Sequence, residues 1–355
     1  MGGKDGKTDL LGLTFAEAEE FFTGLGHPCY RARQVFEWMY SARVRSFADM
    51  TNLPLSLRET LAGAARVGAL ETVARDSPAE GDTVKFLFRL VDGNAVEAVM
   101  MRHDYGITAC VSSQVGCKMA CGFCASGMEG FVRNLLPGEM VAQVTGINET
   151  LQRDRRVSRV VLMGSGEPLD NYDASLKFIR IINESRGLNI GMRHITLSTC
   201  GIVPGIRRLM REGLPITLSV SLHAPDDELR ASLMPVARRY RLSELMNACR
   251  DYGETTGRRV TIEYALVDGV NDQDRHARGL AALLKGGLFH VNLIPLNPVE
   301  GKGFRRARPD RVKEFYALLE NMGIAVTVRR EFGTGVDAAC GQLRRRVARG
   351  GADGV

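Results

Sequence analysis

The chain has few aromatic residues and no long apolar run. Aromatic residues make up 6% of its 355 residues, with a single Trp. No stretch approaches the roughly 20 apolar residues of a membrane span, and the N-terminus MGGKDGKTDLLGL lacks the basic and apolar parts of a secretory signal. We therefore expect a cytoplasmic protein with no membrane association, whose eight cysteines are reduced or metal-bound and form no structural disulfides.

Internal repeats and low-complexity tracts are also absent before the basic C-terminal stretch RRRVARGGADGV. Hydrophobic residues make up 45% of the chain and charged residues 25%, which are ordinary values for a globular protein and exclude wholesale disorder. The length favours one large α/β domain with a smaller domain appended to it.

Positive charge is in modest excess, with a net charge of +6, and the arginines are clustered. Such clusters suit a polyanion such as RNA, but any single cluster is more often a solvated helix face, so charge alone supports RNA only weakly. The clusters are Arg153, Arg155, Arg156 and Arg159; Arg238, Arg239 and Arg241; Arg305, Arg306 and Arg308; and Arg344, Arg345 and Arg346.

Six β runs alternate with amphipathic helical segments from Gly106 onward. This order predicts parallel strands with right-handed crossovers, and the economical arrangement is a six-stranded (β/α)6 partial barrel. Ligands of such sheets lie at the carboxyl ends of the strands. The runs are 107–113, 158–164, 193–199, 216–222, 259–267 and 290–296.

The pattern before Gly106 is different. Apolar Val35, Phe36, Met39 and Tyr40 have helical spacing, and two later apolar runs flank the turn Asp92-Gly93-Asn94, which is a hairpin signal. We therefore divide the chain into a small helical accessory domain at 1–80, a β-hairpin linker at 81–105, the partial barrel at 106–335, and a C-terminal loop with a basic tail at 336–355.

Three cysteines, Cys117, Cys121 and Cys124, follow the spacing C-x3-C-x2-C. Three thiolates from one loop can hold three irons of a 4Fe–4S cluster and leave the fourth iron open to another ligand. A zinc site is the alternative, and it would need a fourth ligand such as Cys110 or His103.

Polar residues follow several of the β runs. In GSGEPLDN, Gly166 would let the backbone approach a ligand and Glu167 offers a carboxylate to an amino group, although a glycine turn before a helix would look the same. Ser198 and Ser221 could each cap a helix, but their joint placement at strand ends favours ligand binding. The same reasoning adds Leu222 and His223, which directly follow Ser221, and Asn297.

The cysteine loop, with Phe123 before its last cysteine, closely resembles the signature of the radical S-adenosylmethionine (SAM) superfamily. The resemblance implies that the open iron chelates SAM, that the GEP motif at Glu167 binds the amino group of SAM, and that a radical forms from SAM. The cofactors implied are a 4Fe–4S cluster and SAM.

Further segments resemble the radical SAM RNA adenine methyltransferases, the RlmN/Cfr family, and lie nearer its RlmN branch. The resemblance covers the chain from about Gly26 to Leu343. The segments are GFVRNL, STCGIVPGI, SLHAPDDELR, VTIEYALVDGVND, NLIPLNP and GTGVDAACGQL, the last of which contains Cys340.

The family resemblance implies a mechanism with two cysteines that consumes two SAM molecules per turnover. Cys340 would carry the methyl group as S-methylcysteine and become bonded through it to adenine, and Glu97 would accept the ring proton. Cys110 would then release the product by forming a transient disulfide with Cys340. For Cys29, Cys200 and Cys249 we expect inert packing as small apolar side chains.

The substrate implied is the peptidyl-transferase adenosine of 23S rRNA, and also tRNA, methylated at carbon 2. Carbon 8, the antibiotic-resistance activity, is the alternative, because HVNLIPLNP and EFG lean toward that branch. Ser165 and CASGME depart from both branches and leave the ring carbon and the target open. A radical SAM activase or peptide-modifying enzyme and a non-catalytic iron–sulfur RNA-binding regulator are the rivals. We expect a monomer and a low-potential electron donor such as flavodoxin or ferredoxin.

Overall fold

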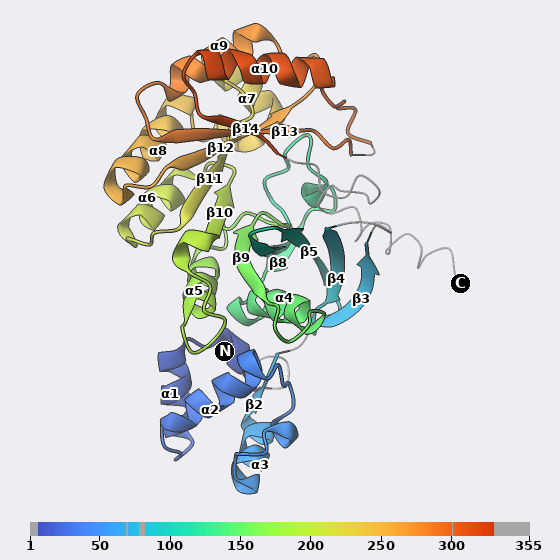
Figure 1. Ribbon diagram of the computed structural model, residues 1–355, viewed down its shortest axis with the longest axis vertical. Coiled ribbons are helices and arrows are strands. Elements are labelled where there is room, and N and C mark those ends of the chain that lie inside the picture. Colours follow the sequence, from blue (N-terminus) through green and yellow to red (C-terminus); the bar gives the residue numbers. More distant parts are fainter. Residues whose placement is uncertain (1–5, 69, 78–81, 300, 330–355) are drawn as a thin grey trace, which may run out of the picture.

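A ten-stranded sheet forms the centre of the molecule (Figure 1). The computed structural model describes residues 6–68, 70–77, 82–299 and 301–329, and within them the strand order is β14-β13-β12-β11-β10-β9-β6-β5-β4-β3. The sheet is open, because β14 and β3 are its two edges in this part of the chain.

Seven strands of this sheet, β6 and β9 to β14, are parallel to one another, and they include all six β runs predicted from the sequence. The seventh, β14, is short. The fold is therefore α/β with a mostly parallel sheet, as expected. The strands are β6 (Gly106–Cys110), β9 (Val157–Leu162), β10 (Ile195–Thr199), β11 (Thr217–Ser221), β12 (Val260–Leu266), β13 (Phe289–Pro295) and β14 (Val326–Val328).

Helices connect these strands, as the alternating pattern predicts, and pack along the outside of the sheet (Figure 1). Three of these helices, α4, α8 and α9, are amphipathic segments of the kind that the sequence predicts between the β runs. The helices are α4 (Pro137–Glu149), α5 (Tyr172–Asn183), α6 (Val203–Arg211), α7 (Asp227–Leu233), α8 (Leu242–Thr256), α9 (Asp274–Leu284) and α10 (Pro309–Asn321).

Alternation along the strands gives the sheet an apolar outer face and a more polar inner face. On β11, Leu218 and Val220 belong to the hydrophobic core beneath the helices, so Ser219 and Ser221 point the other way. On β12, Ile262 likewise packs in this core. We call the face opposite this core the inner face.

The antiparallel end of the sheet contains β3 (Glu71–Asp76), β4 (Thr83–Arg89) and β5 (Ala95–His103). The hairpin expected at 81–105 is present as β4 and β5, but β5 also pairs with β6, so the hairpin continues the main sheet. β3 lies within the segment assigned to the helical domain. Its sequence ETVARD is mostly polar because it is an exposed edge strand, so it gave no apolar signal.

The N-terminal module (residues 6–68) contains α1 (Phe15–Gly24), α2 (Tyr30–Phe36), α3 (Leu55–Ala64) and the short parallel pair β1 (Thr8–Asp9) and β2 (Ala65–Arg66). Thr14 and Glu17 form a capping box that starts α1.

The module packs against α4 and α5 (Figure 1). Lys177 on α5 forms an ion pair with Glu17, with 2.7 Å between Nζ and Oε1, and Arg45 forms an ion pair with Glu149 on α4. The guanidinium of Arg43 donates to the carbonyl of Leu151 at 2.9 Å, and the apolar side chains of the module join the same core as the sheet.

None of the helices in the described ranges has both the length and the apolar character that crossing a lipid bilayer would require.

Candidate active site

The cysteine loop (residues 117–130) is closed at its base by a small antiparallel pair, β7 (Gln114–Gly116) and β8 (Phe131–Asn134). Gly116 has φ +76°, and a Cβ atom there would overlap the carbonyl oxygen of Gly130. Only glycine therefore lets the two ends of the loop approach this closely. The backbone N–H of Cys117 donates to the same carbonyl oxygen at 3.1 Å.

The thiols of Cys117, Cys121 and Cys124 are half-buried and interact electrostatically with one another. Burial raises the pKa of Cys117 to about 11 and raises that of Cys121 as well, so a bound cation must displace the protons. Within the described ranges no three His, Cys, Asp or Glu side chains are grouped closely enough to hold a single metal ion. The three thiols lie within electrostatic range of one another, as the ligands of one cluster must.

Glu167 is buried beside the cysteine loop, within electrostatic range of Cys117 and Cys121. Its carboxylate accepts hydrogen bonds from the backbone N–H groups of Leu169 (3.0 Å) and Cys200 (2.7 Å). Burial raises the pKa of this carboxyl, and these hydrogen bonds oppose the rise. Glu167 therefore ties together the loops that follow β9 and β10, and the side chains of Thr199 and Cys200 also form hydrogen bonds with it.

Gly166 lies against the segment that leads into the cysteine loop. Its φ is +107°, and a Cβ atom there would lie 2.6 Å from Cβ of Gln114 and 2.7 Å from Oγ of Ser113. A side chain at position 166 would therefore clash with the segment that leads into the cysteine loop, and the approach of a ligand to Gly166 stays a prediction.

Ser198 and Ser221 are half-buried at the carboxyl ends of β10 and β11, on the inner face. The helix-cap alternative is wrong for both, because Ile202 and Asp226 are the N-cap residues of the helices that follow. Their hydroxyl groups are thus not used as helix caps.

Leu222 and Asn297 lie differently. The Leu222 side chain is fully buried in the core, so only its backbone could face a ligand, and that N–H donates to the carbonyl of Glu263 at 3.1 Å. Asn297 is exposed in the segment after β13.

His223 is buried against the cysteine loop, with its ring edge-on to that of Phe123 at a centroid distance of 4.8 Å. It adopts φ +59°, and its Nδ1 accepts a hydrogen bond from the backbone N–H of Ala265 at 3.0 Å. Burial, with a contribution from Arg230, lowers the pKa of His223 to about 3, so the ring is neutral near pH 7.

Glu97 and Cys110 lie on adjacent antiparallel strands and are both buried. Val99 pairs with Cys110, and the neighbours of Glu97 and Cys110, such as Val96 and Ala109, pack in the core. Both side chains therefore belong to the inner face. The hydroxyl of Ser112 donates to the carbonyl oxygen of Glu97 at 2.6 Å and holds the two strands in register.

Comparison with known families matches two parts of the chain. Residues 111–279 match the radical SAM superfamily model, and residues 8–67 match the ribosomal RNA large subunit methyltransferase N-terminal domain. The chain is 54% identical to the probable dual-specificity RNA methyltransferase RlmN of Symbiobacterium thermophilum, over 97% of this chain and 93% of that protein. The chain belongs to the RlmN family of radical SAM methyltransferases.

Two further comparisons support this family assignment. The protein of Pelotomaculum thermopropionicum with the same name is 56% identical over 96% of this chain and 93% of its own length. The crystal structure of a radical SAM methyltransferase from Sphaerobacter thermophilus superposes with a TM-score of 0.91 at 48% identity, covering 94% of this chain and 98% of that one. The cofactors of this RlmN-family enzyme are therefore a 4Fe–4S cluster and SAM.

Cys340, which the family resemblance makes the methyl carrier, lies outside the described residues, as do the segment 336–355 and the cluster Arg344 to Arg346. Of the cysteines expected to be inert packing, Cys249 is fully buried, but Cys29 is exposed, so packing is wrong for Cys29. Its position just before α2 directs it to the surface. Cys200 is buried in a small apolar cluster with Leu233 and Met234, against Cys121.

Two buried charged residues of this RlmN-family enzyme were missed by the sequence reasoning. Glu263, on the inner face of β12, accepts hydrogen bonds from the Ser219 hydroxyl (2.6 Å) and the Asn292 amide (2.8 Å), and burial raises its pKa. Arg230 on α7 is completely buried. Alternation within VTIEYALV could have placed Glu263 on the inner face, whereas SLHAPDDELR gives Arg230 the appearance of an ordinary charged helix residue.

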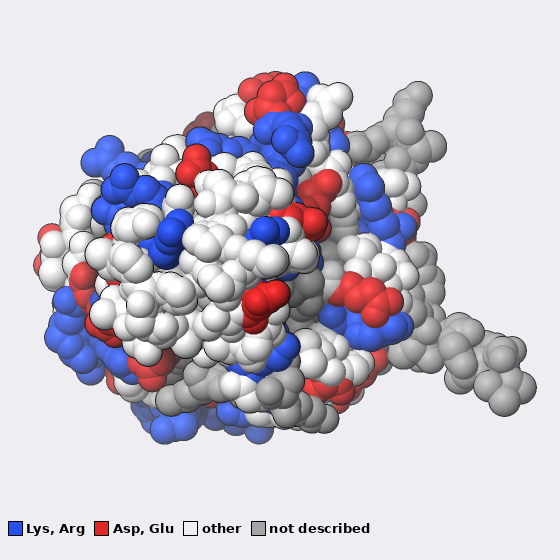
Figure 2. Space-filling view, turned by 90° about the horizontal axis from the view of Figure 1, so that it is seen from below, with Lys and Arg blue, Asp and Glu red and all other residues white. Residues whose placement is uncertain are grey.

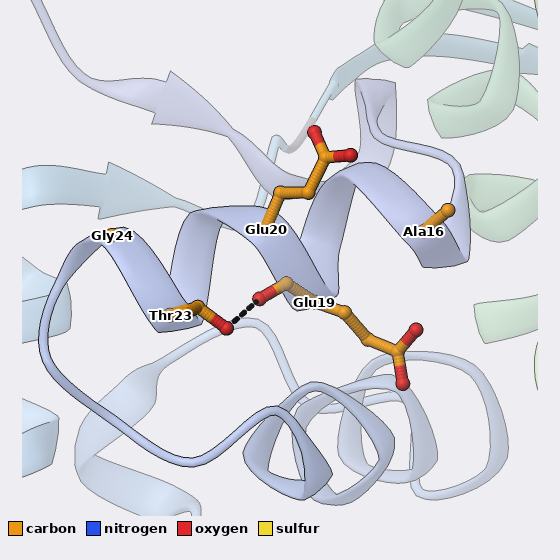
Figure 3. Close-up of a pocket in the computed structure, with 5 residues that line it drawn as sticks. All are labelled: Ala16, Glu19, Glu20, Thr23 and Gly24. Atoms are coloured by element: carbon orange, nitrogen blue, oxygen red, sulfur yellow. Dashed lines mark hydrogen bonds between the residues drawn. The ribbon is translucent and has the colours of Figure 1, made fainter.

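The remaining surface features lie away from the cysteine loop. A pocket on α1 is lined by Ala16, Glu19, Glu20, Thr23 and Gly24, none of which is a predicted site residue (Figure 3). Seen from the end that carries the N-terminal module, Lys and Arg side chains lie around a largely uncharged centre with Asp and Glu between them (Figure 2).

Proposed function

We propose that this enzyme methylates carbon 2 of adenosine in RNA, at the peptidyl-transferase adenosine of 23S rRNA and also in tRNA. One observation carries the proposal. Relatives more than half identical over 93% of their length are named dual-specificity RNA methyltransferases, and the N-terminal module matches a domain named for ribosomal RNA methyltransferases.

We propose that Cys117, Cys121 and Cys124 hold the cluster. Glu167, Ser198, Ser221 and His223 would orient SAM, with Gly166, the Leu222 backbone and Asn297 contributing at the rim. When bound, the cluster and SAM supply the methyl group and the radical chemistry that an electron-poor ring carbon requires, with two SAM molecules consumed per product. The placement of Glu167 beside the loop thiols and of His223 against Phe123 supports this assignment.

The chain's own residues carry the methyl group and the proton. Cys340 accepts the methyl group on its sulfur and delivers it to adenine. Glu97 accepts the proton that leaves carbon 2, and its buried position on the inner face keeps water from competing for that role. Cys110 then attacks the sulfur of Cys340 as a thiolate and forms a disulfide. The bond between that sulfur and the methylene carbon breaks, and the carbon keeps the electron pair and takes up a proton to become the methyl group of the released base. A reductant later reduces the disulfide.

RNA binding must expose the edge of the target adenine ring to the active site. An adenine in folded RNA must be exposed before a side chain can reach it, and a basic protein with an appended module suits this task. We propose that the enzyme acts as a monomer and takes electrons from a low-potential donor such as flavodoxin or ferredoxin.

Mass spectrometry of digested RNA tests the proposal. The anaerobically reconstituted enzyme is incubated with unmethylated 23S rRNA and with unmethylated tRNA, and Cys121→Ala, which lacks a cluster ligand, is the control. We expect 2-methyladenosine in both RNAs with the wild-type enzyme and none with the variant. 8-Methyladenosine would overturn the assignment to carbon 2, and unmethylated RNA after incubation with the cluster-loaded enzyme would overturn the choice of target.

A further inference from the structure

Arg230 joins the two strand ends that flank the proposed SAM site. It is 0% exposed. Its Nη2 donates to the carbonyl of Cys200, after β10, at 2.7 Å and to the carbonyl of Ser221, at the end of β11, at 3.4 Å. Nη1 donates to the carbonyl of Tyr240 at 3.5 Å. The guanidinium thus fixes the spacing of two loops on which ligand binding depends.

The charge of Arg230 is poorly compensated by the residues around it. Its hydrogen-bond acceptors are neutral carbonyl groups, and its Nε has no hydrogen-bond partner among the described residues. Asp227 lies three residues earlier on α7, but it is exposed and accepts a hydrogen bond from the Leu242 N–H. A buried charge is costly without an anionic partner.

Three thiols are also electrostatic partners of Arg230. They include Cys121 of the cysteine loop, together with Cys200 and Cys249. As neutral thiols these groups offer no negative charge, but Cys121 becomes a thiolate when it binds iron. Cluster assembly therefore supplies the anion that Arg230 lacks.

The same helix holds the cysteine loop in place. The carbonyl of Leu233, at the end of α7, accepts a hydrogen bond from the Gly122 N–H at 2.8 Å. Leu233 and Met234 pack with Cys121 and Phe123 in one apolar cluster. α7 carries Arg230 and is hydrogen-bonded to Gly122, the residue next to Cys121. The fold therefore fixes the distance between the Arg230 guanidinium and the Cys121 thiol.

We propose that Arg230 is a positioning residue whose fixed positive charge stabilises the thiolate-bound cluster and raises its reduction potential. Reduction adds one electron, from a low-potential one-electron donor, to a cluster that is already anionic. A buried cation favours the more negative, reduced form over the oxidised form. This inference rests on the cluster-binding part of the proposed function and does not depend on the RNA target.

A redox titration followed by electron paramagnetic resonance tests the inference. The full-length, reconstituted enzyme is titrated with dithionite without RNA, and the iron content is measured in parallel. We expect Arg230→Gln to make reduction about tenfold less favourable, which corresponds to a potential about 59 mV lower for a one-electron couple. Arg230→Lys keeps the charge, so the equilibrium constant for reduction of its cluster should remain within about twofold of the wild-type value.

Arg250→Gln is the matched control. Arg250, on α8, also donates to a backbone carbonyl, that of Leu283, at 2.6 Å, but it is not among the main electrostatic partners of Cys117 and Cys121. We expect the reduction potential of the cluster in Arg250→Gln to equal that of the wild type. A purely structural role for Arg230 would lower the melting temperature of both Arg230 variants and leave the potential unchanged.

An unchanged potential in a fully loaded Arg230→Gln enzyme would overturn the inference. If that variant binds no cluster, Arg230→Lys decides, because a tenfold less favourable reduction with the charge retained would equally contradict it. Since the measurement contains no RNA, a failure to methylate the proposed target leaves its result intact.

Discussion

Glu97 and Cys110 lie thirteen residues apart in the chain and on the same face of two adjacent antiparallel strands. The pair Val99–Cys110 sets the register, so Glu97 is displaced by two residues along its strand. Such diagonal neighbours are typically about 7 to 8 Å apart at their Cα atoms, a distance that one aromatic base can bridge. The proposed base and the proposed resolving thiol can therefore serve the same ring.

Cys110→Ala should trap a covalent complex between protein and RNA. Without the second thiol, the bond between Cys340 and adenine cannot be cleaved by disulfide formation. Denaturing gel electrophoresis with end-labelled RNA should show a slowly migrating band that disappears after nuclease digestion. Cys249→Ala removes a buried thiol from the core and should give no such band, and clean turnover by Cys110→Ala would remove Cys110 from the mechanism.

Cys340→Ala should abolish methyl transfer and leave cluster assembly intact. The reason is that Cys340 is proposed to carry the methyl group, whereas Cys117, Cys121 and Cys124 bind the iron. Iron analysis and visible absorbance should match the wild type, while nucleoside mass spectrometry should detect no methylated adenosine. Methylated RNA from this variant would contradict the two-cysteine mechanism.

Gly116→Ala should destabilise the enzyme and reduce its iron content. The new Cβ atom would overlap the carbonyl oxygen of Gly130, which closes the base of the cysteine loop. We expect the free energy of unfolding to fall by about 2 to 4 kcal/mol. Gly257→Ala is the control, because Gly257 also has a positive φ but open space around it, and it should cost only about 1 kcal/mol. Equal effects of the two substitutions would contradict the importance of the overlap.

The enzyme should lose stability in mild acid, because the contribution of neutral His223 is lost there. Its pKa is about 6.5 when unfolded and about 3 when folded, because burial and Arg230 disfavour the charged ring. This contribution is fully present above pH 6.5 and is lost as the pH falls toward 3. His223→Asn retains a residue that tolerates the left-handed conformation and a side-chain oxygen that can accept from Ala265.

Urea unfolding at pH 7 and pH 5.5 measures the effect of His223. Between these pH values the free energy of unfolding of the wild type should fall by about 1 kcal/mol more than that of His223→Asn. Identical pH dependence of the two proteins would mean that His223 is already solvated in the folded state.

The sequence predicts the six main strands because each is an apolar run bounded by helical segments. It does not predict β7 and β8, which are three and four residues long, because no apolar period can be detected in so few residues. Nor does it predict that Gly166 packs against Gln114, since this contact joins loops 52 residues apart in the chain. The positions of Ser198 and His223 followed from the rule about strand ends, whereas the burial of Arg230 could be seen only in three dimensions.

The shared core of the N-terminal module and the sheet bears on how the enzyme denatures. Leu57 and Leu61 of α3 belong to the same continuous apolar cluster as Val220 and Ile262 of the sheet, so neither part has a separate interior to melt on its own. We therefore expect the two parts to unfold together as one cooperative unit. Damage to the module would then reach the cysteine loop as a loss of global stability.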